Sequence, residues 1–368
     1  MIVPFLVLTL LAALLAWANG SNDISKGIAT LVGSGVSNFR SAVIWGTLWT
    51  VAGGIVAAFA SQGLVATFSG NGFLARVVTG PAFLAAVAIG AIAWLLFASR
   101  TGLPVSTTHS IAGALAGAGV VAEGAAGLHW GTFAQKVALP LGLSPVISVL
   151  LVYALFPLLS RATARVEAYC LCLERTVVIG GPAPAGVIAM SATTTETIVG
   201  TEADCASSPT VAARLSAIDA LHWLSSALTS FARGLNDTPK IVALGIVAAA
   251  TLGITGFPFY LAIALAMGAG SLIAGFRVTE TLAHRVTPMS HGEGFAANLV
   301  TTLLVGAASL VALPVSTTHV SSGAIIGIGL HRGAATIRWH TVREMLLAWL
   351  VTLPVSALVG AGAFALLR

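Results

Sequence analysis

Hydroxyl side chains gather in one seven-residue stretch that occurs twice in this chain. Residues 103–109 and 313–319 both read LPVSTTH. A chance recurrence of seven identical residues is improbable, so the repetition indicates a duplicated structural unit. In each copy the proline and the hydroxyl residues precede a run of small apolar residues. This order is typical of a helix N-terminus capped by Ser or Thr.

Such a helix N-terminus could bind an anion inside a membrane. Its first backbone N–H groups lack partners within the helix, and the helix dipole has its positive end there. The alternative is that the serines only cap buried helices and that the threonines bond back to their own backbone. The duplication favours binding, because a repeated broken segment in corresponding halves usually marks the binding site of a transporter. The predicted anion ligands are Ser106, Thr107, Thr108, Ser316, Thr317 and Thr318.

Two Asn-Asp pairs form a second duplicated motif. Asn22-Asp23 and Asn236-Asp237 interrupt apolar runs, and we expect a helix to break at both places. A carboxylate inside a membrane costs roughly 2.5–3.5 kcal/mol on insertion scales, so each aspartate needs a cation. Three cations are candidates: a sodium ion held by carboxylate, amide and backbone oxygens, a transported proton, or a nearby lysine.

Two of the three lysines in the chain could supply that cation. Lys26 and Lys240 each follow the aspartate of an Asn-Asp pair by three residues, which places both charges on one face of a helix. One interpretation is a structural ion pair at each position, which by itself is weak evidence of stability. The other interpretation is favoured because both pairs recur beside the hydroxyl motifs. It assigns Lys26, Lys240, Asn22 and Asn236 to anion binding, and the Asn-Asp pairs to the coupling ion.

The composition is that of a polytopic membrane protein. Hydrophobic residues make up 57% of the 368 residues, charged residues make up 8%, and the mean hydropathy is +0.98. A soluble domain of this length is far less apolar. The net charge of +5 comes largely from arginines between apolar runs, which indicates topology signals and not a nucleic-acid surface. The three cysteines cannot form a closed disulfide framework, so we expect a reducing compartment.

Helices in two corresponding halves must position these motifs. The intervals from Asn22 to Ser106 and from Asn236 to Ser316 are 84 and 80 residues, so the motifs recur in the same order at nearly the same spacing. The flanks of each hydroxyl motif are too short to span separately, which favours re-entrant hairpins. We predict an all-α polytopic membrane protein with two repeats, broken helices and about ten spans plus two hairpins. Its parts are a first transmembrane repeat at 1–159, a central loop at 160–211 and a second transmembrane repeat at 212–368.

The Asn-Asp pair after the first helix, with Pro-Val-Ser-Thr-Thr-His in both halves, resembles the inorganic phosphate transporter (PiT) family. That family includes sodium–phosphate and proton–phosphate symporters and a few sulfate permeases. The resemblance implies inverted repeats, a central cytoplasmic loop, and phosphate held by the Ser-Thr-Thr hydroxyls and backbone of both hairpins. It also implies that Asn22, Asp23, Asn236 and Asp237 surround the coupling ions.

The sequence departs from the family pattern at four positions. Lys26 and Lys240 stand where the family usually has Asn, and Thr50 and Asn298 stand where it usually has membrane glutamates. Two lost carboxylates and two gained ammonium groups make the site more positive by about four charges. We therefore expect transport that does not require sodium, and that is either proton-coupled or runs downhill.

Three alternatives to a phosphate permease remain open from the sequence, and one of them is a channel, whose flux would not saturate with substrate. A sulfate permease of the same family is the nearer one, since a site whose aspartates are occupied by lysines discriminates poorly between the two anions. An intramembrane hydrolase with Ser106 and His109, or Ser316 and His319, is the distant one. It lacks a G-x-S-x-G elbow, and a catalytic site need not occur twice. The two histidines are expected to make hydrogen bonds within the hairpins.

We thus predict a secondary transporter that is not an enzyme and uses no cofactor. It is expected to be a multi-pass protein of the cell membrane that moves phosphate or sulfate with a proton or sodium ion. No nucleic-acid partner is expected, and a homodimer is among the oligomeric states that the sequence leaves open.

Overall fold

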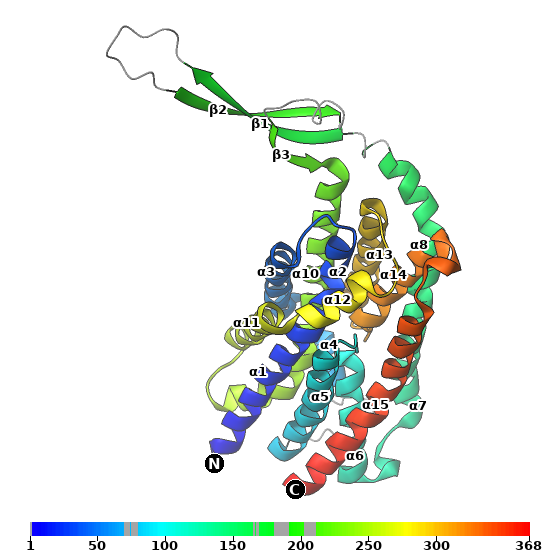
Figure 1. The fold of residues 1–368 in the computed structure, drawn as a ribbon. Helices are drawn as coiled ribbons and strands as arrows, with labels where there is room; N and C mark the ends of the chain where they lie inside the picture. Colours follow the sequence, from blue (N-terminus) through cyan, green and yellow to red (C-terminus); the bar gives the residue numbers. More distant parts are fainter. Residues whose placement is uncertain are drawn as a thin grey trace.

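The protein is a bundle of long helices with a small sheet projecting from one end (Figure 1). The computed structural model describes residues 2–69, 74, 80–164, 166, 169–179, 191–201 and 211–368. Within this part of the chain, seven helical segments are long and apolar enough to cross a membrane. Many of their large apolar side chains are exposed, as expected for helices that face lipid. The nearly all-helical, multi-pass architecture predicted from the composition is confirmed.

The first half consists of helices whose ends follow local sequence signals. The Asn38 side chain caps α3 by accepting a hydrogen bond from the Ser41 N–H. Gly102, with a φ of 77°, ends α5 in the left-handed conformation that glycine adopts most easily. The elements are α1 (Val3–Asp23), α2 (Ser25–Gly33), α3 (Phe39–Ala60), α4 (Gln62–Phe68), α5 (Pro81–Thr101), α6 (Thr107–Glu123), the 3₁₀ turn η1 (Ala125–Gly127), α7 (Trp130–Phe133), the π-helical turn η2 (Ala134–Ala138) and α8 (Leu139–Ala164).

The second half begins after the sheet and repeats much of this order. Ser216 caps α10, and Ser290 with Glu293 forms a capping box at the start of α13. The elements are α10 (Ala217–Thr251), α11 (Phe257–Ala274), α12 (Phe276–His284), α13 (His291–Leu310), α14 (Thr317–Arg332), the 3₁₀ turn η3 (Ala334–Thr336) and α15 (Trp339–Leu367).

The structure shows only a slight interruption at the first Asn-Asp motif and none at the second, where the sequence predicted a helix break at both. In the first half, Ile24 alone separates α1 from α2, and its φ and ψ of −56° and −34° are still helical. In the second half, α10 runs through residues 236–240 without a break, although Pro239 lies inside it. The predicted second break was therefore wrong. A proline removes one N–H from the helix, and packing against neighbouring helices makes that loss tolerable inside a membrane protein.

The central segment contains a sheet that the all-α prediction missed. Strands β1 (Tyr169–Ile179), β2 (Ser191–Thr201) and β3 (Val211–Ser216) pair antiparallel in the order β2-β1-β3. The threonine-rich run of 193–197 lies in β2, where β-branched side chains are favoured. Cys170 is a buried free thiol and Cys172 is disulfide-bonded, so the structure contains a disulfide where the cysteine count favoured a reducing compartment. Cys205 lies outside the described residues.

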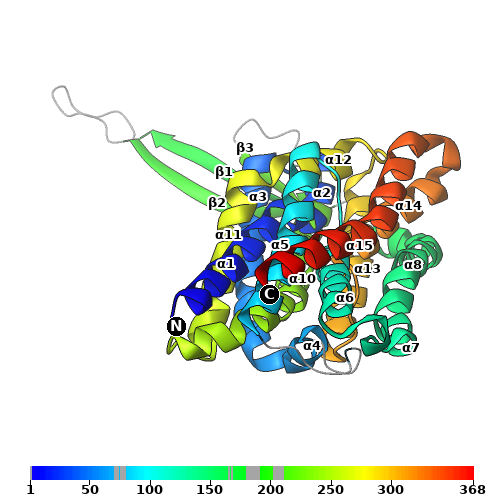
Figure 2. The ribbon, with the colours of Figure 1, turned by 90° about the horizontal axis from the view of Figure 1, so that it is seen from below.

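The helices of the two halves interleave. Helix α1 packs on α11 and α10 packs on α3, while α6 packs on α15 and α14 packs on α8. In Figure 2, α6 lies beside α15, and α14 lies beside α8. Glycines permit these close approaches: a Cβ on Gly20 would lie 1.9 Å from the Met267 carbonyl oxygen, and one on Gly234 would lie 2.1 Å from that of Thr50. The same kind of contact therefore occurs at the same position of each half.

Candidate functional site

Each hydroxyl motif begins a buried helix. Ser106 precedes α6 and Ser316 precedes α14, both with extended backbone angles. Their side chains accept hydrogen bonds from the N–H groups of His109 and His319, at 3.2 and 3.1 Å. This is the cap that the sequence predicts at both positions.

The two helix ends meet in the interior. The Thr108 hydroxyl donates to the Val315 carbonyl at 3.2 Å, and the Thr318 hydroxyl donates to the Val105 carbonyl at 2.7 Å. Each motif therefore bonds to the backbone of the other. At the start of each helix, two backbone N–H groups have no acceptor within the described part of the chain; they belong to Thr107 and Thr108 on α6 and to Thr317 and Thr318 on α14.

The histidines of the two motifs also lie side by side. Their ring centroids are 4.5 Å apart, and the ring of Trp349 lies 4.1 Å from that of His319. His319 Nδ1 lies 3.0 Å from the Leu141 carbonyl oxygen, while Nδ1 of His109 has no partner among the described residues. His319 thus bonds to α8 and not within its own hairpin, and Nδ1 of His109 makes no hydrogen bond to a described residue, so neither ring shows the expected bond at Nδ1.

The first Asn-Asp motif forms a buried ion pair beside its hydroxyl motif. Lys26 Nζ lies 2.7 Å from Asp23 Oδ1 and donates to Asn22 Oδ1 at 2.8 Å. The Asn22 side chain also donates to the Leu103 carbonyl at 3.0 Å and accepts from the Val105 N–H at 3.2 Å. The amide thereby fixes the backbone that leads into α6.

The second Asn-Asp motif reaches both hydroxyl motifs. Lys240 Nζ lies 3.2 Å from Asp237 Oδ1 and also donates to Asn236 Oδ1. It donates to the Thr108 hydroxyl at 2.7 Å and to the Val315 carbonyl at 3.2 Å. One ammonium group thus links α10 to the ends of both α6 and α14.

Asn19, which the sequence analysis missed, joins the two halves of this cluster. Its Nδ2 atom lies 2.9 Å from Asp23 Oδ2, 3.2 Å from Asp237 Oδ2 and 2.9 Å from Thr107 Oγ1. The Thr107 hydroxyl in turn donates to Asp23 Oδ2 at 3.1 Å. All twelve predicted site residues lie in or at the edge of this buried cluster, Ser106 and Ser316 as caps and Thr317 at the start of α14.

Arg233 is a second residue that the sequence analysis missed. It stands four residues before Asp237, as Asn19 stands four residues before Asp23. The side chain is 1% exposed, and none of its three guanidinium nitrogens has a hydrogen-bond partner within the described residues. Comparing the residues that flank the two Asn-Asp motifs would have drawn attention to this position.

Two serines repeat in the same way. Ser99 on α5 accepts from Asn22 Nδ2 at 3.4 Å, and Ser309 on α13 accepts from Asn236 Nδ2 at 2.9 Å. Each serine stands seven residues before the capping serine of its half, so spacing could have revealed it.

The positions expected for family glutamates contain neutral buried side chains. Thr50 Oγ1 and Asn298 Nδ2 have no partner among the described residues. The same residues include no cluster of three or more His, Cys, Asp or Glu side chains that could hold a metal ion. Each carboxylate of the site has a lysine ammonium group as its ion-pair partner, at 2.7 Å for Asp23 and 3.2 Å for Asp237.

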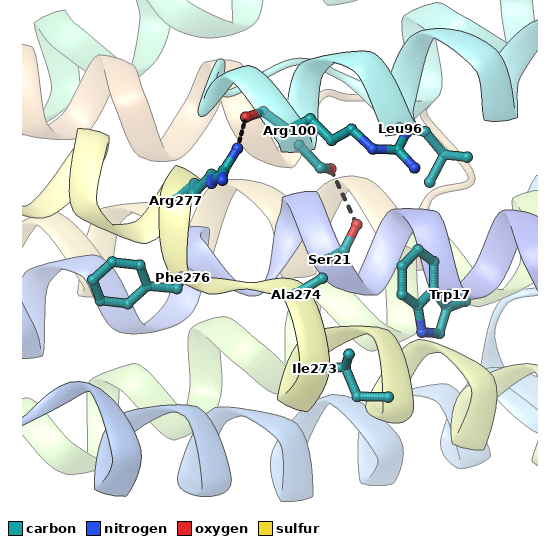
Figure 3. Close-up of a pocket in the computed structure, with 9 residues that line it drawn as sticks. Trp17, Ser21, Leu96, Arg100, Ile273, Ala274, Phe276 and Arg277 are labelled. Carbon is teal, nitrogen blue, oxygen red and sulfur yellow. Dashed lines mark hydrogen bonds between the residues drawn. The ribbon is translucent and has the colours of Figure 1, made fainter.

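A cavity of about 430 Å³ lies beside the cluster, between α1, α5, α11 and α12 (Figure 3). Its wall includes Ser21 and Ser99, whose hydroxyl oxygens are 3.0 Å apart. Arg100 and Arg277, both exposed, line it as well, and the Arg277 guanidinium donates to the Arg100 carbonyl. Because Ser99 also accepts from Asn22, one hydrogen bond separates the cavity wall from the buried cluster.

Comparison with known proteins gives one consistent result. Residues 19–360 match the model of the "Phosphate transporter family". A putative phosphate permease of Pyrococcus abyssi is 30% identical over 403 residues, covering 99% of this chain and 98% of its own. A probable low-affinity inorganic phosphate transporter of Bacillus subtilis is 28% identical over 386 residues, with the same coverage. A solved structure titled "The sodium-dependent phosphate transporter" has the same fold, with a TM-score of 0.77 at 21% identity over 99% of both chains.

Proposed function

Because the chain belongs to the phosphate transporter family, we propose that it carries inorganic phosphate through the cell membrane by alternating access about the buried cluster. The family is one of transporters and not of enzymes, so the hydrolase alternative is wrong. Ser106, Ser316 and the four threonines after them are the proposed ligands, together with Asn22, Asn236, Lys26 and Lys240.

The meeting of two helix N-termini carries this proposal. The backbone N–H groups at the starts of α6 and α14 that have no acceptor among the described residues are suited to a tetrahedral oxyanion, which accepts hydrogen bonds in several directions. The hydroxyls of Thr108 and Thr318 now donate to carbonyls of the opposite motif. An anion bound between the helices would take over these donors, so binding would change the contacts that join the two halves.

Alternating access requires two units that move against each other. The interleaved packing of α1 on α11 and α10 on α3 supports two inverted repeats, 1–159 and 212–368, with re-entrant hairpins at the hydroxyl motifs. In this proposal 160–211 is the cytoplasmic connection, and the cavity beside Ser21 and Ser99 is the route by which an anion reaches the site.

The coupling ion is proposed from the two ion pairs. An ammonium about 4 Å from a carboxylate gains roughly 4 kcal/mol at an effective dielectric constant of 20, enough to compete with a weakly held sodium ion. Lys26 and Lys240 are closer than that to Asp23 and Asp237. We therefore expect transport without sodium, driven by a proton gradient through Asp23 or Asp237 or running downhill.

Because of the same two ion pairs, sulfate is the second candidate for the transported anion. Phosphate can donate a proton to a free carboxylate whereas sulfate cannot, but both carboxylates here accept hydrogen bonds from Asn19 and a lysine. Neither carboxylate is therefore the free acceptor that would favour phosphate.

Uptake of labelled phosphate and labelled sulfate into proteoliposomes tests these proposals. We expect saturable phosphate uptake in sodium-free buffer, faster with an inward proton gradient if protons are coupled. Phosphate uptake that does not saturate would indicate a channel. Preferential uptake of sulfate would show that sulfate, and not phosphate, is the substrate.

A further inference from the structure

Arg233 holds a charge that no side chain in the described part of the chain pairs. It lies on α10, one helical turn from Asp237 and on the same face. It interacts electrostatically with Asp23 and Asp237, yet it makes no ion pair within 4.0 Å in the described residues. A guanidinium that is only 1% exposed and lacks hydrogen bonds is costly, because it has lost its water without gaining partners.

A count of the buried charges leads to the same residue. Five ionisable side chains in the cluster are at most 2% exposed, and three of them are basic while two are acidic; they are Asp23, Lys26, Arg233, Asp237 and Lys240. Each aspartate already has a lysine within 3.2 Å. The formal charge of the cluster is therefore +1, and the unpaired member is Arg233.

We infer that Arg233 is a ligand of the transported anion, which supplies the negative charge that the cluster lacks. This inference rests on the proposed function. A guanidinium can donate two parallel hydrogen bonds to two oxygens of a tetrahedral oxyanion, a geometry that a lysine cannot match. One negative charge on the anion makes the loaded cluster neutral, so a singly charged oxyanion such as dihydrogen phosphate fits without an added cation. Asn19 occupies the corresponding position of the first half, so only the second half provides the guanidinium.

A purely structural role for Arg233 leads to opposite expectations. If the guanidinium serves only to balance Asp23 and Asp237, its removal destabilises the protein when no anion is present. If it serves the anion, its removal relieves an unpaired buried charge. The anion-free protein then stays as stable or becomes more stable, while anion binding weakens.

Thermal unfolding of the purified full-length protein, measured with and without inorganic phosphate, separates the two roles. The variants are Arg233→Gln and Arg233→Lys, with Arg40→Gln as the control because Arg40 is an exposed arginine on α3. We expect Arg233→Gln to keep or raise the melting temperature without phosphate and to weaken phosphate binding at least tenfold. Arg233→Lys should fall between it and the wild type, and Arg40→Gln should match the wild type.

Two results would contradict the proposed role of Arg233 without contradicting the proposed function. One is unchanged phosphate affinity in Arg233→Gln, and the other is a lower melting temperature or failure to fold without phosphate. Both leave phosphate binding by the wild type intact. A wild type whose unfolding does not respond to phosphate would instead contradict the proposed function and with it this inference.

Discussion

At the scale of single residues, the threonine hydroxyls are the proposed donors to the anion. Replacing Thr107 and Thr108 together by Val, or Thr317 and Thr318 together, keeps the side-chain volume but removes donors. Hydrogen bonds to charged groups are worth about 1.5–3 kcal/mol each, so we expect phosphate uptake to fall at least tenfold for either pair.

Initial rates of labelled phosphate uptake in proteoliposomes measure this effect. Thr251→Val is the matched control, because Thr251 is exposed at the end of α10 and its hydroxyl donates to the Val247 carbonyl of its own helix. Unchanged rate and apparent affinity in both double variants would disprove the assigned role of the hydroxyl motifs.

The lysines allow a second test at this scale. Replacing Lys26 and Lys240 together by Asn removes the ammonium groups that neutralise Asp23 and Asp237. The uncompensated charge of the two buried carboxylates should then weaken phosphate binding severalfold or make uptake depend on sodium. Uptake is compared with sodium or potassium as the only added cation.

Lys136→Asn controls for the loss of a lysine, because Lys136 is exposed and lies outside the cluster. If the wild type shows no uptake without sodium and steep stimulation with it, the lysines are structural partners only and the proposed coupling is wrong.

At the scale of helices, glycines set how closely the two halves approach. Gly20→Ala would place a methyl group 1.9 Å from the Met267 carbonyl oxygen, and Gly234→Ala would place one 2.1 Å from that of Thr50. Overpacking of this kind costs about 1–3 kcal/mol, so each variant should unfold at a lower temperature.

Gly306→Ala is the control for this pair of variants, because no atom lies within 4 Å of the added methyl group on α13. It should be neutral or slightly stabilising, since alanine favours the helix. Equal melting temperatures for all three variants would mean that the α1–α11 and α3–α10 contacts are looser than described.

At the scale of the whole molecule, two arginines line the cavity that we propose as the route to the site. Arg100 and Arg277 line it, and Arg285 lines an adjoining cavity of about 280 Å³ that also contains Glu280. Basic groups at the mouth of a cleft raise the local concentration of an anion, and salt screens this effect.

We therefore expect Arg100→Gln combined with Arg277→Gln to raise the KM for phosphate severalfold at low ionic strength, with little change in kcat. The difference from the wild type should shrink as salt is added. A loss of kcat with unchanged KM would show that these arginines act on conformational change and not on access.

The sequence by itself determined the features that depend on neighbouring residues. The apolar composition required a multi-pass membrane protein. Proline followed by hydroxyl residues required capped helix starts at Ser106 and Ser316. An offset of three residues put Lys26 against Asp23 and Lys240 against Asp237, because that spacing joins side chains on one helix face.

Only the tertiary structure decided what depends on packing between distant segments. Asn19 bonds to Asp237, 218 residues away, because α1 and α10 pack together in the core. Whether α10 would break at its Asn-Asp motif depended on the neighbours around it, and local polarity gave the wrong answer. The unpaired state of Arg233 likewise follows from which side chains the fold brings to it. A local pattern specifies a helix and its face, but it does not specify what that face will meet.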